Sequence, residues 1–294
     1  MKFAVELDGA PEATPVGLDT AAVMTKAGAE NFPVATRLVP RRIRRQLLAI
    51  YGYARFVDDV GDVVPGDRLA QLDWVEAELD RALAGSATHP VFVAVGRVAR
   101  DLGVDRDPFI DLIEANRQDQ VVTRYRTYEL LEAYCALSAN PVGRLVLAVF
   151  GRRDAASGEL SDRVCTALQL VEHFQDVAED FAAGRIYLPE EDLTRFGVDE
   201  GTIAAGAATA SFRRLMAFES ARARRLLGSG RPLVASLTGW GGIAVAGFVG
   251  GGLAQLDAIE RRGFDVLSAP VKASKTHVAS RSLEAWALAR RNRP

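Results

Sequence analysis

The chain has 294 residues, of which 49% are hydrophobic and 25% charged, and its formal net charge is −2. It can bury one sizeable core, and no Pro/Gly/Ser-rich linker divides it, so we expect one domain. The near-neutral charge offers no basic field for nucleic acid. The arginine-rich run at residues 40–45 is short and interrupted, as in a solvated helix start.

The N-terminal segment, residues 1–19, carries early acids and lacks a cationic start followed by an apolar run. This pattern is not that of a signal peptide, and we interpret the segment as a flexible leader. Cys135 and Cys165 lie far apart in apolar helical stretches, which is typical of buried free thiols in a reducing compartment. We therefore expect a cytoplasmic protein.

Helical periodicity dominates the rest of the chain, and strand signals are few. After a first helical stretch that ends near residue 62, apolar side chains recur at helical spacing in residues 67–83, 91–102, 108–120 and 128–150. Proline and glycine separate these segments. The pattern predicts an all-α fold.

Residues 232–256 form an uncharged segment about long enough to cross a bilayer. Its seven glycines are instead typical of a helix that approaches its neighbours closely or leaves space for a ligand. We favour a buried helix that lines an apolar cavity. Further candidates for the cavity wall are Phe32, Val142, Gly143 and Phe248, with plain core packing as the alternative.

The C-terminal residues 275–294 form a basic tail in which Leu283, Trp286 and Leu288 can share an apolar face. This combination supports the hypothesis of a tail that rests peripherally on an anionic membrane, at its inner face. A solvated or disordered tail is the alternative.

Two acid clusters of the same design lie more than a hundred residues apart. Their acids are, in chain order, Asp58, Asp59, Asp62, Asp176, Glu179 and Asp180. In each cluster one aspartate follows another by four residues at the end of a helical stretch, so both carboxylates project from one helix face. Like charges at this spacing, next to apolar residues, need partners unless they form a solvated face without function.

A hard divalent cation is the simplest partner common to both clusters. Mg²⁺ takes one or two carboxylates and completes its shell with water and phosphate oxygens, so two such faces opposing each other would clamp a diphosphate. Arg55 and Tyr51 share the face of Asp58, and Arg185 follows the second cluster. The planar guanidinium group suits phosphate oxygens, although a salt bridge to a neighbouring acid is the alternative for each arginine.

Three motifs, at residues 49–62, 175–180 and 184–189, together resemble the squalene and phytoene synthases, which couple two prenyl chains head to head. The resemblance covers residues 29–274. It implies a single-domain isoprenoid-synthase helical bundle around a large apolar cavity, with two opposing Asp-rich helices and a catalytic domain at residues 20–274.

Within the family, residues 30–34, 138–143 and 173–176 look most like the bacterial hopanoid branch, which makes hydroxysqualene from presqualene diphosphate. Phytoene synthases usually carry Asn and Arg where this chain has Glu172 and Gln175, so one positive charge is missing here.

The resemblance also implies roles for individual residues. Arg55, Arg185 and Mg²⁺ would neutralise the leaving diphosphate, and the carbocation would rearrange in a dry cavity until a positioned water quenches it. Tyr51 would lie near the diphosphate and Tyr134 near the reacting carbons, unless either is an ordinary core tyrosine with a bonded hydroxyl. His173, three residues before Asp176, could support a metal ligand or be a polar wall residue, and we favour the wall.

Other functions stay open at this point. The enzyme alternatives are a presqualene diphosphate synthase and a one-step squalene or phytoene synthase that acts on farnesyl or geranylgeranyl diphosphate. No nicotinamide site is recognisable, and contact with pathway enzymes is an expectation only. A non-catalytic helical scaffold would have eroded acid clusters, whereas both are whole. A di-iron bundle needs Glu-x-x-His pairs, and none of the three histidines has one.

Overall fold

The structure is a computed structural model that describes residues 39–291. The expectations for residues 1–38, which include the leader, the motif at residues 30–34 and Phe32, lie outside the described residues. The helices of the described part are, in chain order, α2 (Arg41–Asp62), α3 (Arg68–Ala84), α4 (Pro90–Leu102), α5 (Asp107–Asp119), α6 (Tyr128–Ser138), α7 (Asn140–Val149), α8 (Ala155–Gln175), α9 (Val177–Ala182), α10 (Glu190–Phe196), α11 (Glu200–Ala204), α12 (Ala210–Gly230), α13 (Pro232–Ser236), α14 (Gly239–Arg261) and α15 (Lys275–Arg291).

Local signals in the sequence decide where many of these helices begin and end. The side chain of Asp67 accepts a hydrogen bond from the backbone N–H of Ala70 at 3.1 Å and starts α3, and Asp154 starts α8 in the same way. Gly85 ends α3 in the left-handed region, with φ at 85°, where a side chain would be strained. The helices predicted at residues 67–83, 91–102 and 108–120 therefore differ from α3, α4 and α5 by about one residue at each end.

Two longer segments that we expected to be continuous are broken. Residues 128–150 form α6 and α7, which meet at Ala139, because Pro141 has no N–H to continue the first helix and occupies the first turn of the second. Residues 232–256 divide between α13 and α14, where Leu237 adopts an extended backbone with ψ at 144°.

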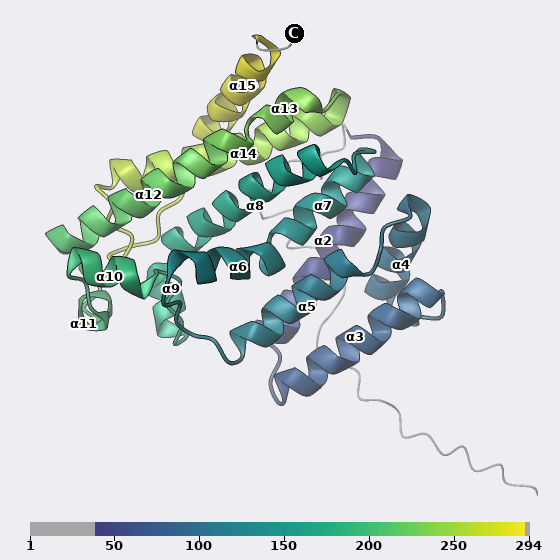
Figure 1. Ribbon diagram of the computed structural model, residues 1–294, viewed down its shortest axis with the longest axis horizontal. Helices are drawn as coiled ribbons and strands as arrows, with labels where there is room; N and C mark the ends of the chain where they lie inside the picture. The colour runs from purple at the N-terminus through teal and green to yellow at the C-terminus, as the bar shows by residue number, and fades with distance from the viewer. Residues whose placement is uncertain (1–38, 292–294) are drawn as a thin grey trace, which may run out of the picture.

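The described chain folds into one all-α bundle, in which the long helices α8, α12 and α14 run side by side and α2 to α5 form the opposite part (Figure 1). No strand occurs between residues 39 and 291, where a single isolated bridge pairs Arg124 with Ile186. The bridge ties the segment before α6 to the segment after α9. The fold therefore agrees with the single-domain helical bundle expected from the sequence.

The glycine-rich helix α14 is packed on several sides. It contacts α8, α12, α13 and α15, and although it is long and apolar enough to span a membrane, 67% of its most apolar window is buried within the bundle. A Cβ at Gly250 would collide with the backbone of Ser282 in α15, and one at Gly252 would crowd Leu168 and Leu227. These glycines therefore permit close helix approach rather than leave space for a ligand.

The C-terminal segment is a helix rather than a disordered tail over residues 275–291. Helix α15 packs along α14, with Ala285 and Ala289 buried and Trp286 against an apolar cluster. Of the apolar face expected from the sequence, Leu283 is exposed at 64%. The alternative of a disordered tail is therefore wrong over these residues, because Gly250 lets α15 approach α14 and Asp257 binds His277 and Arg281, while contact with a membrane stays a prediction.

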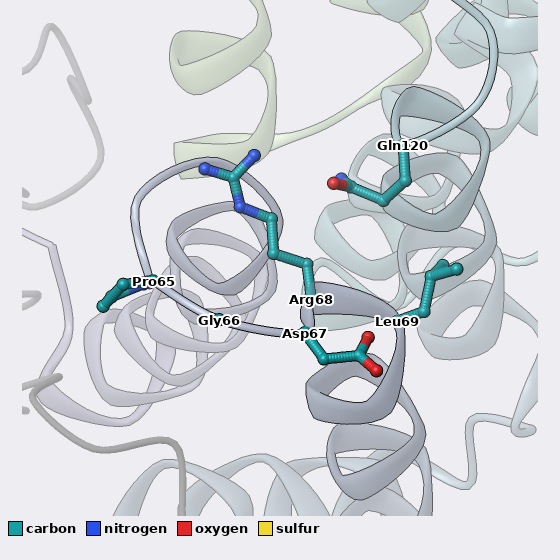
Figure 2. A pocket seen from close by; sticks show the side chains of 6 residues that line it. All are labelled: Pro65, Gly66, Asp67, Arg68, Leu69 and Gln120. Carbon is teal, nitrogen blue, oxygen red and sulfur yellow. The ribbon is translucent and has the colours of Figure 1, made fainter.

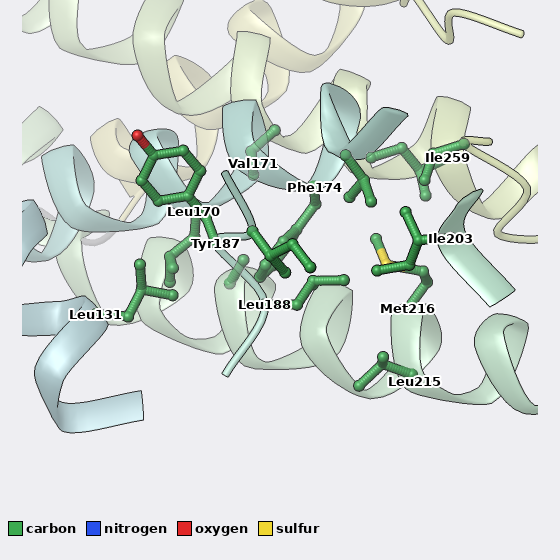
Figure 3. Close-up of a cluster of buried hydrophobic side chains, with 14 of the residues drawn as sticks. Leu131, Leu170, Val171, Phe174, Tyr187, Leu188, Ile203, Leu215, Met216 and Ile259 are labelled. Carbon is green, nitrogen blue, oxygen red and sulfur yellow. The ribbon is translucent and has the colours of Figure 1, made fainter. Parts of the chain in front are cut away.

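A cluster of buried apolar side chains includes residues of α8 that directly precede the second acid cluster in the chain (Figure 3). It joins Phe174 of α8 and Leu188 of the segment after α9 to Met216 of α12 and Ile259 of α14, and each of these is at most 1% exposed. Fully burying a side chain of this size contributes about 1.5–3 kcal/mol. The cluster thereby fixes the segment that carries Arg185.

Candidate active site

Helix α2 presents the first acid cluster over its last turns. Asp59 is 3% exposed and its Oδ1 lies 2.9 Å from Nη2 of Arg55, so the salt bridge considered for Arg55 is formed. Asp58 Oδ1 accepts a hydrogen bond from Nδ2 of Asn116 at 3.1 Å. Tyr51 is 8% exposed two turns earlier on the same helix.

The second acid cluster is carried by a bend and not by one continuous helix. Helix α8 ends at Gln175, and Asp176 leaves the helical region with φ at −103° and ψ at 16° before α9 begins. Asp180 still donates its backbone N–H to the carbonyl of Asp176 at 2.8 Å. The two aspartates therefore stay one turn apart, as the spacing predicted, although the helix is interrupted.

Arg185 brings the two acid clusters together. Its Nη1 lies 2.8 Å from Oδ1 of Asp62, although the two residues are 123 positions apart in the chain. Arg185 follows Gly184, whose positive φ of 86° reverses the chain just after α9. The guanidinium group bonds to Asp62 and its charge lowers the pKa of Asp180, and its five N–H donors leave it able to bind an anion.

Asp119, at the end of α5, is a site residue that the sequence did not single out. Its carboxylate accepts hydrogen bonds from the hydroxyls of Tyr134 at 2.5 Å and Tyr187 at 2.9 Å. The Tyr134 hydroxyl is therefore bonded, as in one of the two alternatives for this residue. The ring stacks on that of Tyr187, with centroids 5.6 Å apart.

His173 lies between this tyrosine group and the second acid cluster. It is 7% exposed and stacks on Tyr187 with ring centroids 3.9 Å apart, while its Nδ1 is 4.0 Å from Oδ2 of Asp180. Burial and the charge of Arg185 lower the pKa of His173 to about 3. The ring is therefore neutral at physiological pH. His173 is not among the described residues that line the cavity, so its role as a polar wall residue stays a prediction.

The carboxyl groups of the site are difficult to ionise. Burial raises the pKa of Asp58 to about 6 despite the opposing Asn116 hydrogen bond, and it raises that of Asp119 to about 6. Asp58 is nonetheless exposed to solvent where it lines a cavity. Burial and then the charge of Asp176 raise the pKa of Asp180 to about 7. Nearby Arg55 and Arg185 thus do not offset the effect of burial on these acids.

An apolar cavity of about 260 Å³ opens beside the acids. It is slightly smaller than the about 300–1,000 Å³ of most small-molecule sites. Its described wall consists of Asp58, Ser138, Ala139, Val142, Gly143, Val146, Leu147, Ser161, Val164, Cys165, Leu168, Gln169, Glu172, Leu233, Val245 and Phe248. The structure therefore places Val142, Gly143 and Phe248 in the wall, as predicted, whereas Tyr51 and Tyr134 are not among these residues.

A second, polar cleft of about 390 Å³ lies at the turn that follows α2 (Figure 2). Arg68 and Gln120 extend into it and donate hydrogen bonds to carbonyls at the end of α2, namely those of Asp62 at 2.9 Å and Gly61 at 3.1 Å. Both side chains thereby hold the last turn of the helix that presents Asp62.

The metal ligands that the two clusters offer are carboxylate oxygens, which suit Mg²⁺. Between residues 39 and 291, no three His, Cys, Asp or Glu side chains are grouped into a ready-made metal cage. Mg²⁺ does not require such a cage, because it commonly binds one or two carboxylates with water and phosphate. The raised pKa values of Asp58 and Asp180 also fit, since a cation would supply the missing charge.

Several contributors could not be recognised in the sequence. Asn116 and Asp119 of α5, and Gln120 just after it, belong to a run of polar residues, and only the packing of α5 beside α2 gives them a role. Gln175 donates to Asp176 Oδ1 at 2.9 Å, and Lys272 opposes the rise in the pKa of Asp176 that burial causes.

The arrangement of two acid faces, a bridging arginine and an adjoining apolar cavity agrees with the comparison to known proteins. The sequence pattern of the squalene/phytoene synthase family matches residues 25–277. The chain belongs to the squalene/phytoene synthase family. Most of α15 lies beyond the matched residues.

Individual relatives within this family carry different names. The chain is 36% identical to the phytoene synthase of Mycobacterium tuberculosis over 177 residues, which span 60% of this chain and 58% of that protein. It is 34% identical to the hydroxysqualene synthase of Rhodopseudomonas palustris over 212 residues, or 71% of each chain.

Solved structures extend the similarity to the fold. The squalene synthase HpnC of Alicyclobacillus acidocaldarius is 41% identical, has a TM-score of 0.76, and is matched over 85% of this chain and 98% of its own. A dehydrosqualene synthase has a TM-score of 0.82 at 24% identity, with 92% and 96% of the chains covered, and at that identity the likeness concerns the fold.

Proposed function

We propose that this protein ionises presqualene diphosphate with the help of Mg²⁺ and quenches the cation with water, which yields hydroxysqualene and free diphosphate. The observation that carries the proposal is the bond between Arg185 and Asp62, because it closes the two acid clusters into one site beside an apolar cavity. A substrate that carries a diphosphate on a long apolar chain needs the acid clusters for its diphosphate and the cavity for its chain.

The residues divide the work by their chemistry. Asp58 and Asp62 on one side, and Asp176 and Asp180 on the other, would hold Mg²⁺, which neutralises charge on the leaving diphosphate. Arg185 would bind phosphate oxygens directly, because it already lies between the clusters.

Residues of the cavity wall would exclude bulk water and hold a single water molecule. Val146, Leu168 and Phe248 form an apolar wall that keeps bulk water away from a cation. The same wall includes Ser138, Gln169 and Glu172, which are the polar groups near which a single water would be held. A quenching water requires such groups in an otherwise apolar cavity.

The hydroxysqualene reaction is favoured over head-to-head coupling by the second acid cluster. Gln175 is a neutral donor to Asp176, where phytoene synthases usually carry arginine, so the diphosphate side has one positive charge fewer. The similarity to a hydroxysqualene synthase supports the same branch, whereas HpnC is described as a squalene synthase. Formation of phytoene or presqualene diphosphate is the second candidate, because the mycobacterial phytoene synthase is equally similar in sequence.

Product analysis tests the proposal. Purified protein and Mg²⁺, without nicotinamide cofactor, would be incubated separately with presqualene, farnesyl and geranylgeranyl diphosphate in ¹⁸O-labelled water. We expect an alcohol that carries ¹⁸O to form from presqualene diphosphate alone. Conversion of farnesyl or geranylgeranyl diphosphate into a coupled product would assign the chain to the second candidate instead.

A further inference from the structure

Asn116 contacts the first acid cluster from another helix. It is 7% exposed, and its Nδ2 donates hydrogen bonds to Asp58 Oδ1 and to the carbonyl of Leu112, each at 3.1 Å. The amide group therefore uses its N–H donors in two directions. If the amide were turned over, its oxygen would face two acceptors, so only one orientation is favourable.

Gly61, inside the first acid cluster, leaves the space that Asn116 fills. A Cβ at this position would overlap Oδ1 of Asn116 and lie 2.9 Å from its Cγ, and the three nearest atoms all belong to Asn116. Glycine within a helix is less favourable than alanine, and the backbone of Gly61 has no positive φ that would require it. The close approach of Asn116 is therefore the structural reason for glycine here.

We propose that Asn116 is a positioning residue for Asp58, and that Gly61 admits its side chain to this place. Asn116 holds Oδ1 of Asp58 in one direction and leaves Oδ2 to a divalent cation. Among the described residues, no other side chain donates a hydrogen bond to Asp58. The inference rests on the proposed function, in which Asp58 is a cation ligand.

Metal binding gives a readout that does not depend on turnover. Mn²⁺, which accepts the same oxygen ligands, would be titrated into the protein with inorganic diphosphate and followed by electron paramagnetic resonance. We expect Asn116→Ala to weaken Mn²⁺ binding about tenfold, because partners that orient a metal ligand typically contribute about 10–100-fold. Asn116→Leu fills similar space without a donor, so it should weaken binding equally while the melting temperature stays near that of the wild type.

A double-mutant cycle tests the role of Gly61. Gly61→Ala should weaken Mn²⁺ binding and lower the melting temperature, because the new methyl group displaces the amide. In the Asn116→Ala background the two closest atoms are gone and the nearest one left is Cβ at 3.2 Å, so Gly61→Ala should have little further effect. Gly158→Ala, on α8 with no atom within 4 Å of its Cβ position, is the matched control and should leave Mn²⁺ binding unchanged.

The positioning role of Asn116 and the proposed function would be contradicted by different results. Wild-type Mn²⁺ binding in both Asn116 variants, in a protein that converts prenyl diphosphates, would overturn the positioning role alone. Additive effects of Gly61→Ala and Asn116→Ala would contradict the shared contact. Weakened Mn²⁺ binding in the variants of a protein that converts no prenyl diphosphate would support the positioning role and overturn the proposed function.

Discussion

Asp180 illustrates the energetic cost of assembling the site from individual residues. Its pKa is raised to about 7 by burial and by Asp176, against an ordinary value of 3.8. At pH values between these two pKa values, Asp180 keeps its proton in the folded protein but has released it in the unfolded chain. Asp180 therefore lowers the stability of the fold increasingly as pH rises from about 4 to 7. The ionised carboxylate of Asp180 is therefore unfavourable in the folded protein, at the place where a cation and a diphosphate are proposed to bind.

We predict that Asp180→Asn stabilises the protein in the presence of a chelator. The gain over the wild type should grow from pH 5 to pH 8, to a few kcal/mol at most, because one pKa unit corresponds to about 1.4 kcal/mol. Urea unfolding followed by circular dichroism at several pH values measures it. A gain that stays constant with pH would show that Asp180 is not held protonated by its surroundings.

Tyr134 shows that the tyrosines and the buried acid depend on one another. We expect Tyr134→Phe to lower the free energy of unfolding by about 1–3 kcal/mol, because Asp119 would lose a hydrogen bond in a buried place. Tyr128→Phe is the matched control, since its hydroxyl bonds to the exposed Glu132, and it should change stability by less than about 0.5 kcal/mol. Equal losses in both variants, measured by urea unfolding, would argue against the Asp119 contact.

At the scale of elements, α5 determines much of the site by its position alone. Its last turn and the residue after it place Asn116 beside Asp58, Asp119 beside Tyr134 and Tyr187, and Gln120 at the end of α2. The sequence shows these residues only as polar positions on an amphipathic helix. No spacing rule links them to an acid cluster about 58 residues earlier, because the link arises from helix packing.

Glycines in α14 determine how α15 docks. We predict that Gly250→Ala lowers the free energy of unfolding by about 1–3 kcal/mol, because the new methyl group would overlap the backbone of Ser282, which cannot rotate away. Gly251→Ala, the next residue, has open space and should be neutral or slightly stabilising. Thermal unfolding of both variants distinguishes them, and equal stability would contradict the close approach of the two helices.

At the scale of the whole molecule, the sequence was sufficient for the fold class and for the two acid clusters, because helical periodicity and four-residue spacing are local properties. It did not reveal the break at Ala139, the bend at Asp176 or the docking of α15, which depend on proline geometry and on tertiary contacts. The partner of Arg185 is likewise a tertiary result, since Asp62 is 123 residues away.

The central claim is that two acid clusters form a single site for Mg²⁺ and a diphosphate. The most direct measurement is steady-state turnover of presqualene diphosphate and farnesyl diphosphate by Asp58→Asn and Asp176→Asn, with Asp73→Asn as a control at a 71% exposed acid. We predict that each site variant loses about 10²-fold or more in kcat, while the helical circular dichroism spectrum and the control are unchanged. Wild-type turnover in either site variant would contradict the account.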